Sequence, residues 1–280
     1  MSYRTLLFAI DDEPLAEAQV DHAAQLARAS EGRLVGLSCH RPTPWPRDGA
    51  VGFIEGDPLT IELRAAEEAA VARETVFLQR CRLAGLTASD AILDPAEMAS
   101  AVCRHAMYAD LVVMSQPPSA GRHHVEQLRR VHAVLQDSIR PVLLLPRAGR
   151  FTPPARTALV AWDGSAGAAR AASAAVPLLR CAKLVQLVQI FDPRLEDGTA
   201  LQPALERAAA WLSGHGIDVR AQVLASDLPA ADALSAEVAR GGVQLLVMGA
   251  WGHRRVVERL LGGATRSMVE QMTVPVLFAH

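Results

Sequence analysis

Short hydrophobic runs recur along this chain, and longer segments of mixed polar and apolar residues separate them. Leu245–Met248 contains only hydrophobic residues, which is typical of a buried strand. In the second half the pattern predicts strands at 157–162, 184–190, 219–224, 244–249 and 274–279, and helices at 166–179, 200–214, 229–241 and 264–272. Short apolar strands that alternate with helices predict an α/β fold, in which helices cover both faces of a parallel sheet.

The first half repeats this pattern. Residues 5–11, TLLFAID, match residues 157–163, TALVAWD, 152 positions later, and residues 111–115, LVVMS, match residues 245–249, LLVMG, 134 positions later. Two copies of one domain would explain both matches. The sequence therefore predicts two tandem, doubly wound domains, each with a parallel five-stranded sheet.

The change in offset indicates an insertion in the first half, because 152 minus 134 leaves 18 extra residues. Residues 41–58 are rich in Pro and Gly and have no counterpart in the second half, so we expect the insertion there. Such a segment is either functional or simply tolerated at the surface. We expect residues 147–156 to link domains at 1–147 and 156–280.

A glycine pattern follows the apolar run at 245–248. Gly249, Gly252 and Gly262 form a G-x2-G-x9-G motif, Gly263 comes directly after it, and a predicted helix begins there. Glycine allows the backbone to approach a ligand closely, and the free N–H groups at a helix start bind anions. In open α/β sheets, ligands bind beyond the carboxyl ends of the strands. The pattern therefore indicates a phosphate-binding turn in the second domain.

Three features of the second half together resemble the universal stress protein family. They are Asp163-Gly164-Ser165 after the first strand, the G-x2-G-x9-G motif, and Val274-Pro275-Val276-Leu277 in the last strand. In the first half the resemblance depends on the repeat alone. The resemblance implies the adenine nucleotide α-hydrolase-like fold of this family, in which members that carry the glycine motif bind ATP.

The resemblance also implies the residues of a nucleotide site in the C-terminal domain. These are Asp163 and the backbone of Ile190 at the ribose and adenine, Gly249, Gly252, Gly262 and Gly263 around the ribose and phosphates, and His253 and Thr265 as further contacts. The family usually has Ser or Thr where this chain has Gly263, so Thr265 would have to supply the hydroxyl. Whether Mg²⁺ accompanies the nucleotide stays open. Asp163 also has a structural interpretation as a helix cap, and His253 has one as an exposed loop residue.

The first domain departs from the motif. It keeps Asp11, but Ser115 and Pro118 replace the first two motif glycines, and Leu128-Arg129 replace the last pair. Pro118 has no N–H to donate, and its φ is fixed. We therefore do not expect the first domain to bind ATP in the way of the family.

The composition narrows the class of protein. Half of the residues are hydrophobic, 21% are charged and the net charge is −2, so neither nucleic acid nor an anionic membrane is an expected partner. We find no apolar run of membrane-spanning length and no signal peptide, and therefore expect a cytoplasmic protein. The four cysteines form no CxxC pair, and His123-His124 and His132 lack matching carboxylates or thiols. No metal site is predicted.

These observations favour a stress-response protein that binds ATP, or a related adenine nucleotide, for regulation. The chain has no P-loop lysine and no evident His partner for Ser165, so we expect at most slow ATP hydrolysis. The alternative is a protein that does not bind nucleotide and acts through dimerisation or partner binding. The resemblance further implies that residues 142–145 and 276–278 pair antiparallel within the chain, with homodimers as a further step of assembly.

Overall fold

The computed structural model describes residues 3–11, 17–40, 58–121, 123–195, 197–250 and 263–280. The first half contains β1 (Thr5–Ile10), α1 (Glu17–Ala29), β2 (Arg33–Cys39), α2 (Pro58–Leu83), β3 (Ser89–Asp94), α3 (Met98–His105), the short helix η1 (Ala106–Tyr108), β4 (Leu111–Ser115), α4 (His124–Asp137) and β5 (Val142–Leu145). The second half contains β6 (Thr157–Ala161), α5 (Ala166–Leu179), β7 (Leu184–Phe191), η2 (Gly198–Ala200), α6 (Gln202–Gly214), β8 (Val219–Ala225), α7 (Ala230–Arg240), β9 (Leu245–Gly249), α8 (Gly263–Gln271) and β10 (Val276–Ala279).

The strands form a ten-stranded sheet in the order β3-β2-β1-β4-β5-β10-β9-β6-β7-β8. Within each half all pairs of neighbouring strands are parallel, and the order 3-2-1-4-5 of the first half recurs as 8-7-6-9-10 in the second. The predicted fold class, two tandem doubly wound α/β units, is therefore confirmed. In the second half the bounds of the strands and helices agree with the predicted bounds to within two residues.

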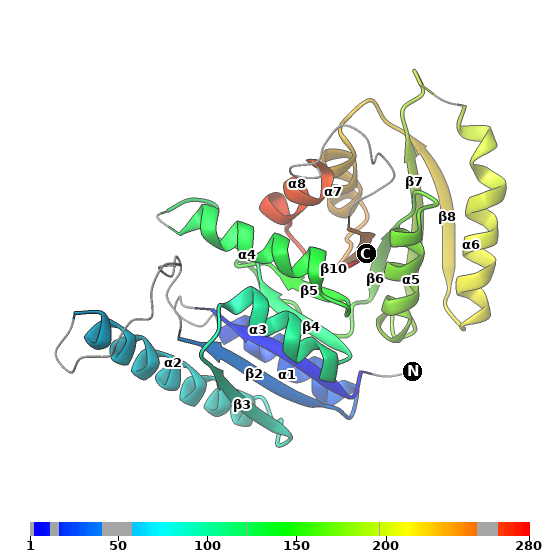
Figure 1. The fold of residues 1–280 in the computed structure, drawn as a ribbon. Helices are drawn as coiled ribbons and strands as arrows, with labels where there is room; N and C mark the ends of the chain where they lie inside the picture. Colours follow the sequence, from blue (N-terminus) through cyan, green and yellow to red (C-terminus); the bar gives the residue numbers. More distant parts are fainter. Residues whose placement is uncertain (1–2, 12–16, 41–57, 122, 196, 251–262) are drawn as a thin grey trace.

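The two halves meet at their last strands. β5 and β10 pair antiparallel, with Val142 opposite Phe278 and Leu144 opposite Val276. These strands lie at the centre of the molecule in Figure 1, with the other elements of each half on either side. One sheet therefore runs through both halves.

Helices cover both faces of this sheet, because side chains of successive strand residues point to opposite faces. In β1, Leu7 packs in a core with α3, α4, α7 and α8, whereas Leu6 and Phe8 pack in a second core with α1, α2, α5 and α6. Both cores extend through the two halves and include buried residues of β5 and β10. In folds of this kind, ligands bind beyond the carboxyl ends of the strands.

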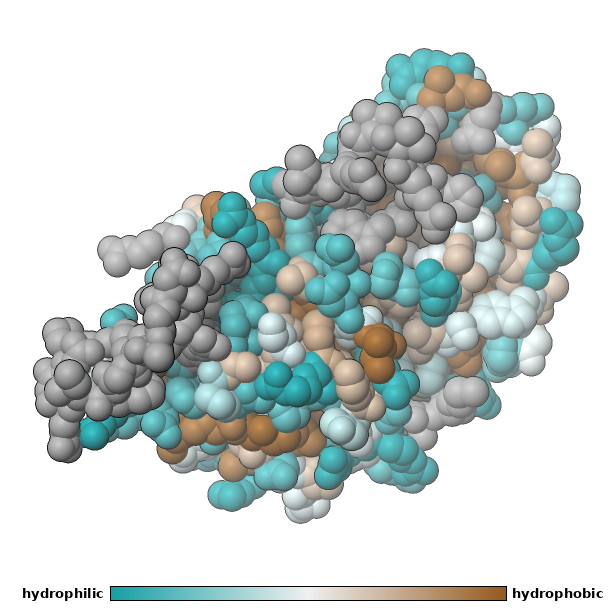
Figure 2. All heavy atoms as spheres, viewed as in Figure 1, coloured by the Kyte–Doolittle hydropathy of each residue, from teal (hydrophilic) through white to brown (hydrophobic). Residues whose placement is uncertain are grey.

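The predicted insertion at 41–58 lies outside the described residues, apart from Pro58, where α2 begins. Of the helices that the structure describes, none is long and apolar enough to cross a membrane. On the face shown in Figure 2, hydrophilic and hydrophobic side chains are interspersed.

Candidate functional site

The strand order of the second half reverses between β6 and β9. From β6 the chain continues outward to β7 and β8, then returns to the other side of β6 to form β9 and β10. Such a reversal leaves a crevice beyond the carboxyl ends of the two strands at which it occurs. Asp163 follows β6 and Gly249 ends β9. The structure thus brings these two predicted site residues to neighbouring strand ends.

Asp163 shapes the turn between β6 and α5. Its Oδ1 accepts a hydrogen bond of 2.9 Å from the backbone N–H of Ser165, and Gly164 between them has φ +74°. The Ser165 hydroxyl oxygen accepts from the N–H of Ala168 at 3.0 Å and is the N-cap of α5. The helix cap is therefore Ser165, and Asp163 holds the turn in front of it.

Asp163 keeps one carboxylate oxygen open. The residue is exposed, and no described residue donates a hydrogen bond to its Oδ2. A carboxylate accepts through both oxygens. Asp163 can therefore serve the turn and still accept a hydrogen bond from a bound hydroxyl group.

Gly249 has a packing role that the sequence motif did not reveal. A Cβ atom at this position would lie 2.7 Å from the backbone N of Ala168 and 2.8 Å from the carbonyl carbon of Gly167. The first turn of α5 thus packs directly on the end of β9. Glycine is required here for the approach of a helix backbone, whether or not a ligand also approaches.

The other residues of the predicted nucleotide site differ in their position and burial. Ile190 lies half-buried near the carboxyl end of β7, the strand next to β6. Gly263 begins α8. Thr265, in the first turn of α8, is only 3% exposed, so its side chain is buried. Gly252, His253 and Gly262 lie outside the described residues.

The corresponding region of the first half is filled by its own side chains. Asp11 follows β1 as Asp163 follows β6, and its Oδ1 lies 3.9 Å from Nη1 of Arg130 on α4, whose side chain is 7% exposed. The hydroxyl of Ser115, which ends β4, donates to Oε1 of buried Gln19 at 2.5 Å. The same glutamine donates from Nε2 to the carbonyl oxygen of Pro146 at 2.9 Å.

Arg130 and Gln19 were not among the residues that the sequence singled out. At the offsets of the repeat they correspond to Ala264 and Ala171, since 130 plus 134 is 264 and 19 plus 152 is 171. The sequence did contain a signal for these two residues. One copy has a charged or amide side chain at a position where the other copy has alanine. Leu128, which stands where the motif has Gly262, is a buried core residue.

A glutamine of the first half also reaches into the second. Nε2 of Gln116 donates to the carbonyl oxygens of Val269 and Glu270 at 3.0 and 3.2 Å, near the C-terminal end of α8. These carbonyls lack partners within the helix. Gln116 thus links the loop after β4 to the helix that follows the glycine motif.

A comparison with known protein families identifies the family of this chain. The Universal stress protein family matches residues 2–146, about half of the chain. The chain belongs to the universal stress protein family. The match lies in the first half, whereas the glycine motif on which the sequence resemblance mainly depends lies in the second.

Solved structures of universal stress proteins share the fold along the whole chain. A universal stress protein from Archaeoglobus fulgidus DSM 4304 has a TM-score of 0.76 at 17% identity, covering 98% of this chain and 95% of its own. A putative universal stress protein from Pseudomonas aeruginosa UCBPP-PA14 has a TM-score of 0.60 at 13% identity, covering 99% and 93%. No curated protein matches this chain. At such identities the likeness concerns the fold alone.

The histidines considered for a metal form no common site. His123 is exposed and lies 3.9 Å from a Glu126 oxygen, and Nδ1 of His124 contacts the Pro118 carbonyl. His132 is buried, and both its burial and the nearby charge of Arg266 lower its pKa. Within the described residues there is no group of three His, Cys, Asp or Glu that could hold a metal ion.

Proposed function

We propose that this protein is a cytosolic stress-response protein that binds ATP, or a related adenine nucleotide, in its C-terminal half. The observation that carries the proposal is the exposed Asp163, with one carboxylate oxygen open, beside the reversal of strand order between β6 and β9. A ribose offers two hydroxyl donors to such a carboxylate. The glycine motif that follows β9 would then surround the phosphates.

The first half supports a single site per chain. Arg130 lies within ion-pair distance of Asp11, and the hydroxyl of Ser115 donates a hydrogen bond to Gln19. A nucleotide would have to displace these buried contacts, which is unfavourable because it leaves polar groups without partners. We therefore propose one nucleotide for each chain.

We further propose that binding is regulatory and at most slowly hydrolytic. The Ser165 hydroxyl, the only hydroxyl in the Asp-Gly-Ser segment, is used as the cap of α5. A nucleophile needs an adjacent base, and no described histidine contacts Ser165. Occupied and empty states would then differ in shape or partner binding, not in chemistry.

Calorimetric titration of ATP into the full chain tests this proposal. Asp163→Asn retains an oxygen for the N–H of Ser165, so the turn persists while the charge is lost. We expect ATP affinity to fall about tenfold, which is about 1.4 kcal/mol, because hydrogen bonds to charged groups are the stronger ones. Asp11→Asn is the matched control and should leave the affinity unchanged.

Three outcomes contradict the proposal. A stoichiometry near two, or equal losses in the two Asp→Asn variants, would show that the first half also binds. Gly262→Leu, which places a bulky side chain in the last part of the motif, should abolish binding. Unchanged affinity in that variant would disprove the role of the motif.

One observation favours the alternative of an interaction protein that binds no nucleotide and acts through dimerisation or another partner. Gly263 has no hydroxyl, and the side chain of Thr265 is buried, so neither presents an exposed hydroxyl to a phosphate. Native mass spectrometry of the purified protein separates the two candidates. A retained adenine nucleotide supports the first, and absence of binding even at millimolar ATP supports the second.

A further inference from the structure

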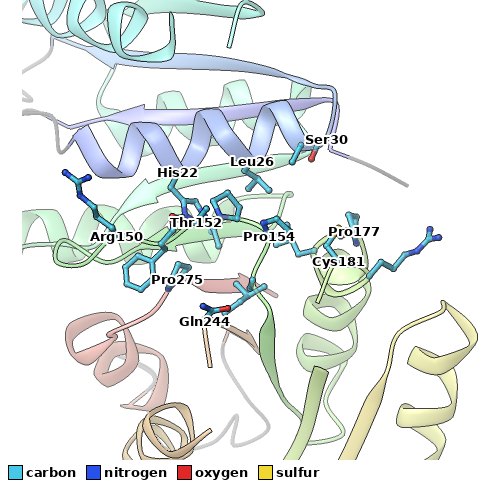
Figure 3. Close-up of a pocket in the computed structure, with 18 residues that line it drawn as sticks. His22, Leu26, Ser30, Arg150, Thr152, Pro154, Pro177, Cys181, Gln244 and Pro275 are labelled. Carbon is cyan, nitrogen blue, oxygen red and sulfur yellow. Dashed lines mark hydrogen bonds between the residues drawn. The ribbon is translucent and has the colours of Figure 1, made fainter. Parts of the chain in front are cut away.

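A second cavity lies between the two halves, away from the proposed nucleotide site. Its volume is about 530 Å³, within the size range of small-molecule sites. Cys181 after α5 and Gln244 before β9 line it, and both lie at the amino ends of the second-half strands that follow them. Figure 3 shows the linker residues Thr152 and Pro154 passing between α1 and the second half. Within the second half the cavity thus lies at the amino ends of the strands, whereas Asp163 follows the carboxyl end of β6.

His22 is a buried polar side chain in the wall of this cavity. The residue is 8% exposed, lines the cavity, and its Nδ1 lies 2.8 Å from the carbonyl oxygen of Phe151. A carbonyl only accepts hydrogen bonds, so Nδ1 carries the proton and Nε2 of the neutral ring is an acceptor. Burial lowers the pKa of His22, which keeps the ring neutral near pH 7. No described residue donates to Nε2.

The remaining walls are mainly apolar. Leu26, Leu143, Phe151, Leu178 and Leu245 contribute hydrocarbon surface. No Asp or Glu is among the described residues that line the cavity, so a cationic ligand would find no counter-charge there.

The two arginines at the cavity do not form an anion-binding site in its interior. Arg150 and Arg180 are both exposed. In Figure 3 the guanidinium of Arg150 points away from the other lining residues. The interior therefore suits an uncharged molecule.

We propose that this cavity binds a small, uncharged and largely hydrocarbon molecule with one hydroxyl group, such as a simple phenol, whose O–H donates to Nε2 of His22. The hydrocarbon body fills the space between α1, α5 and the linker. Because both halves and the linker line the site, bound ligand contacts both halves at once. Among the described residues, the lining of this cavity shares none with the proposed nucleotide site.

Calorimetry with a matched pair of probes tests the polar contact. 4-Ethylphenol has the donor, and 4-ethylanisole has the same body with a methyl ether in place of the hydroxyl. We expect the full-length protein to bind the phenol at least tenfold more tightly than the ether. His22→Phe, which keeps an aromatic ring but removes the acceptor, should reduce this preference to less than threefold. No binding of the phenol at 5 mM, or equal binding of the two probes, overturns the proposal.

A second pair of variants tests the location without touching the buried histidine. Ala29 is exposed and lines the cavity, so Ala29→Phe should fill the space and abolish phenol binding. Ser173→Phe places the same ring on an exposed position of α5 that does not line the cavity, and binding should persist. Cys181 is an exposed thiol at the cavity, and the phenol should slow its alkylation by N-ethylmaleimide at least threefold. Retained binding in Ala29→Phe, or an unchanged alkylation rate at saturation, shows that the phenol binds elsewhere and overturns the assignment.

Discussion

The two halves have one strand order but different contents at the ends of their central strands. In the second half, no described residue donates to the second carboxylate oxygen of Asp163, and β9 ends in Gly249. In the first half, Arg130 approaches Asp11, and the residue that ends β4, Ser115, is hydrogen-bonded to Gln19. A duplicated fold can therefore keep its topology while one copy fills the ends of its central strands with side-chain contacts.

The largest expected effect concerns the end of β9. Gly249→Val should destabilise the protein by about 3 kcal/mol, because its Cβ would meet the backbone of α5 at 2.7 Å and overpacking costs about 1–3 kcal/mol or more. Ser115→Val at the equivalent position of the first half should cost about 1 kcal/mol, the value of a lost hydrogen bond. Urea unfolding measures both. Equal costs would show that the two strand ends are packed alike.

A second difference lies at the ends of β3 and β8. Asp94 Oδ1 accepts from the N–H of Ala96, and Oδ2 from Arg104 and His105. Ser226, which follows β8, makes the equivalent turn by accepting from the N–H of Leu228. The second half thus has an uncharged group where the first has a carboxylate.

This difference predicts acid sensitivity in the first half. Burial raises the pKa of Asp94, but the hydrogen bonds from Arg104, Ala96 and His105 outweigh it and lower the pKa from 3.8 to about 2. A carboxyl with a depressed folded-state pKa stabilises the protein above its unfolded-state pKa, and this contribution is lost as pH falls through the folded-state pKa. Between about pH 4 and pH 2 we expect the stability difference between wild type and Asp94→Asn to shrink by about 2 kcal/mol. A constant difference in urea unfolding across that range would contradict this prediction.

The smallest expected effect comes from a substitution that gives the second half an arginine at the position of Arg130 in the first half. Ala264 is exposed on α8 at the position that corresponds to Arg130. Ala264→Arg should place a guanidinium near Asp163 and lower ATP affinity about tenfold, or about 1.4 kcal/mol, in calorimetric titration. Ala264→Leu controls for size and should have a smaller effect. Tighter ATP binding in the Arg variant would mean that the cation contacts phosphate instead of Asp163.

The repeat made most of the fold predictable, whereas the site depended on contacts that local patterns do not encode. The succession of strands and helices along the chain followed from two matched copies of alternating apolar segments. Gly249 was ambiguous because glycine permits the approach of either a ligand or a helix, and only the three-dimensional structure shows the first turn of α5 packed against it. The Arg130–Asp11 pair joins residues far apart in sequence, so no periodicity could indicate it. The burial of Thr265 depends on the rotation of α8 about its axis, which a boundary prediction accurate to one or two residues leaves undetermined.

The antiparallel pairing of β5 with β10 does not depend on the concentration of the protein. Because both strands belong to one chain, their meeting is a unimolecular event whose effective concentration is set by the linker and not by expression level. Two separate copies of such a domain would dissociate on dilution, whereas this pair cannot. It also places the last strand of each half in the interior of the sheet, so that β3 and β8 remain as its outer edges. A cell could therefore keep this protein at very low abundance without losing the arrangement of its two halves.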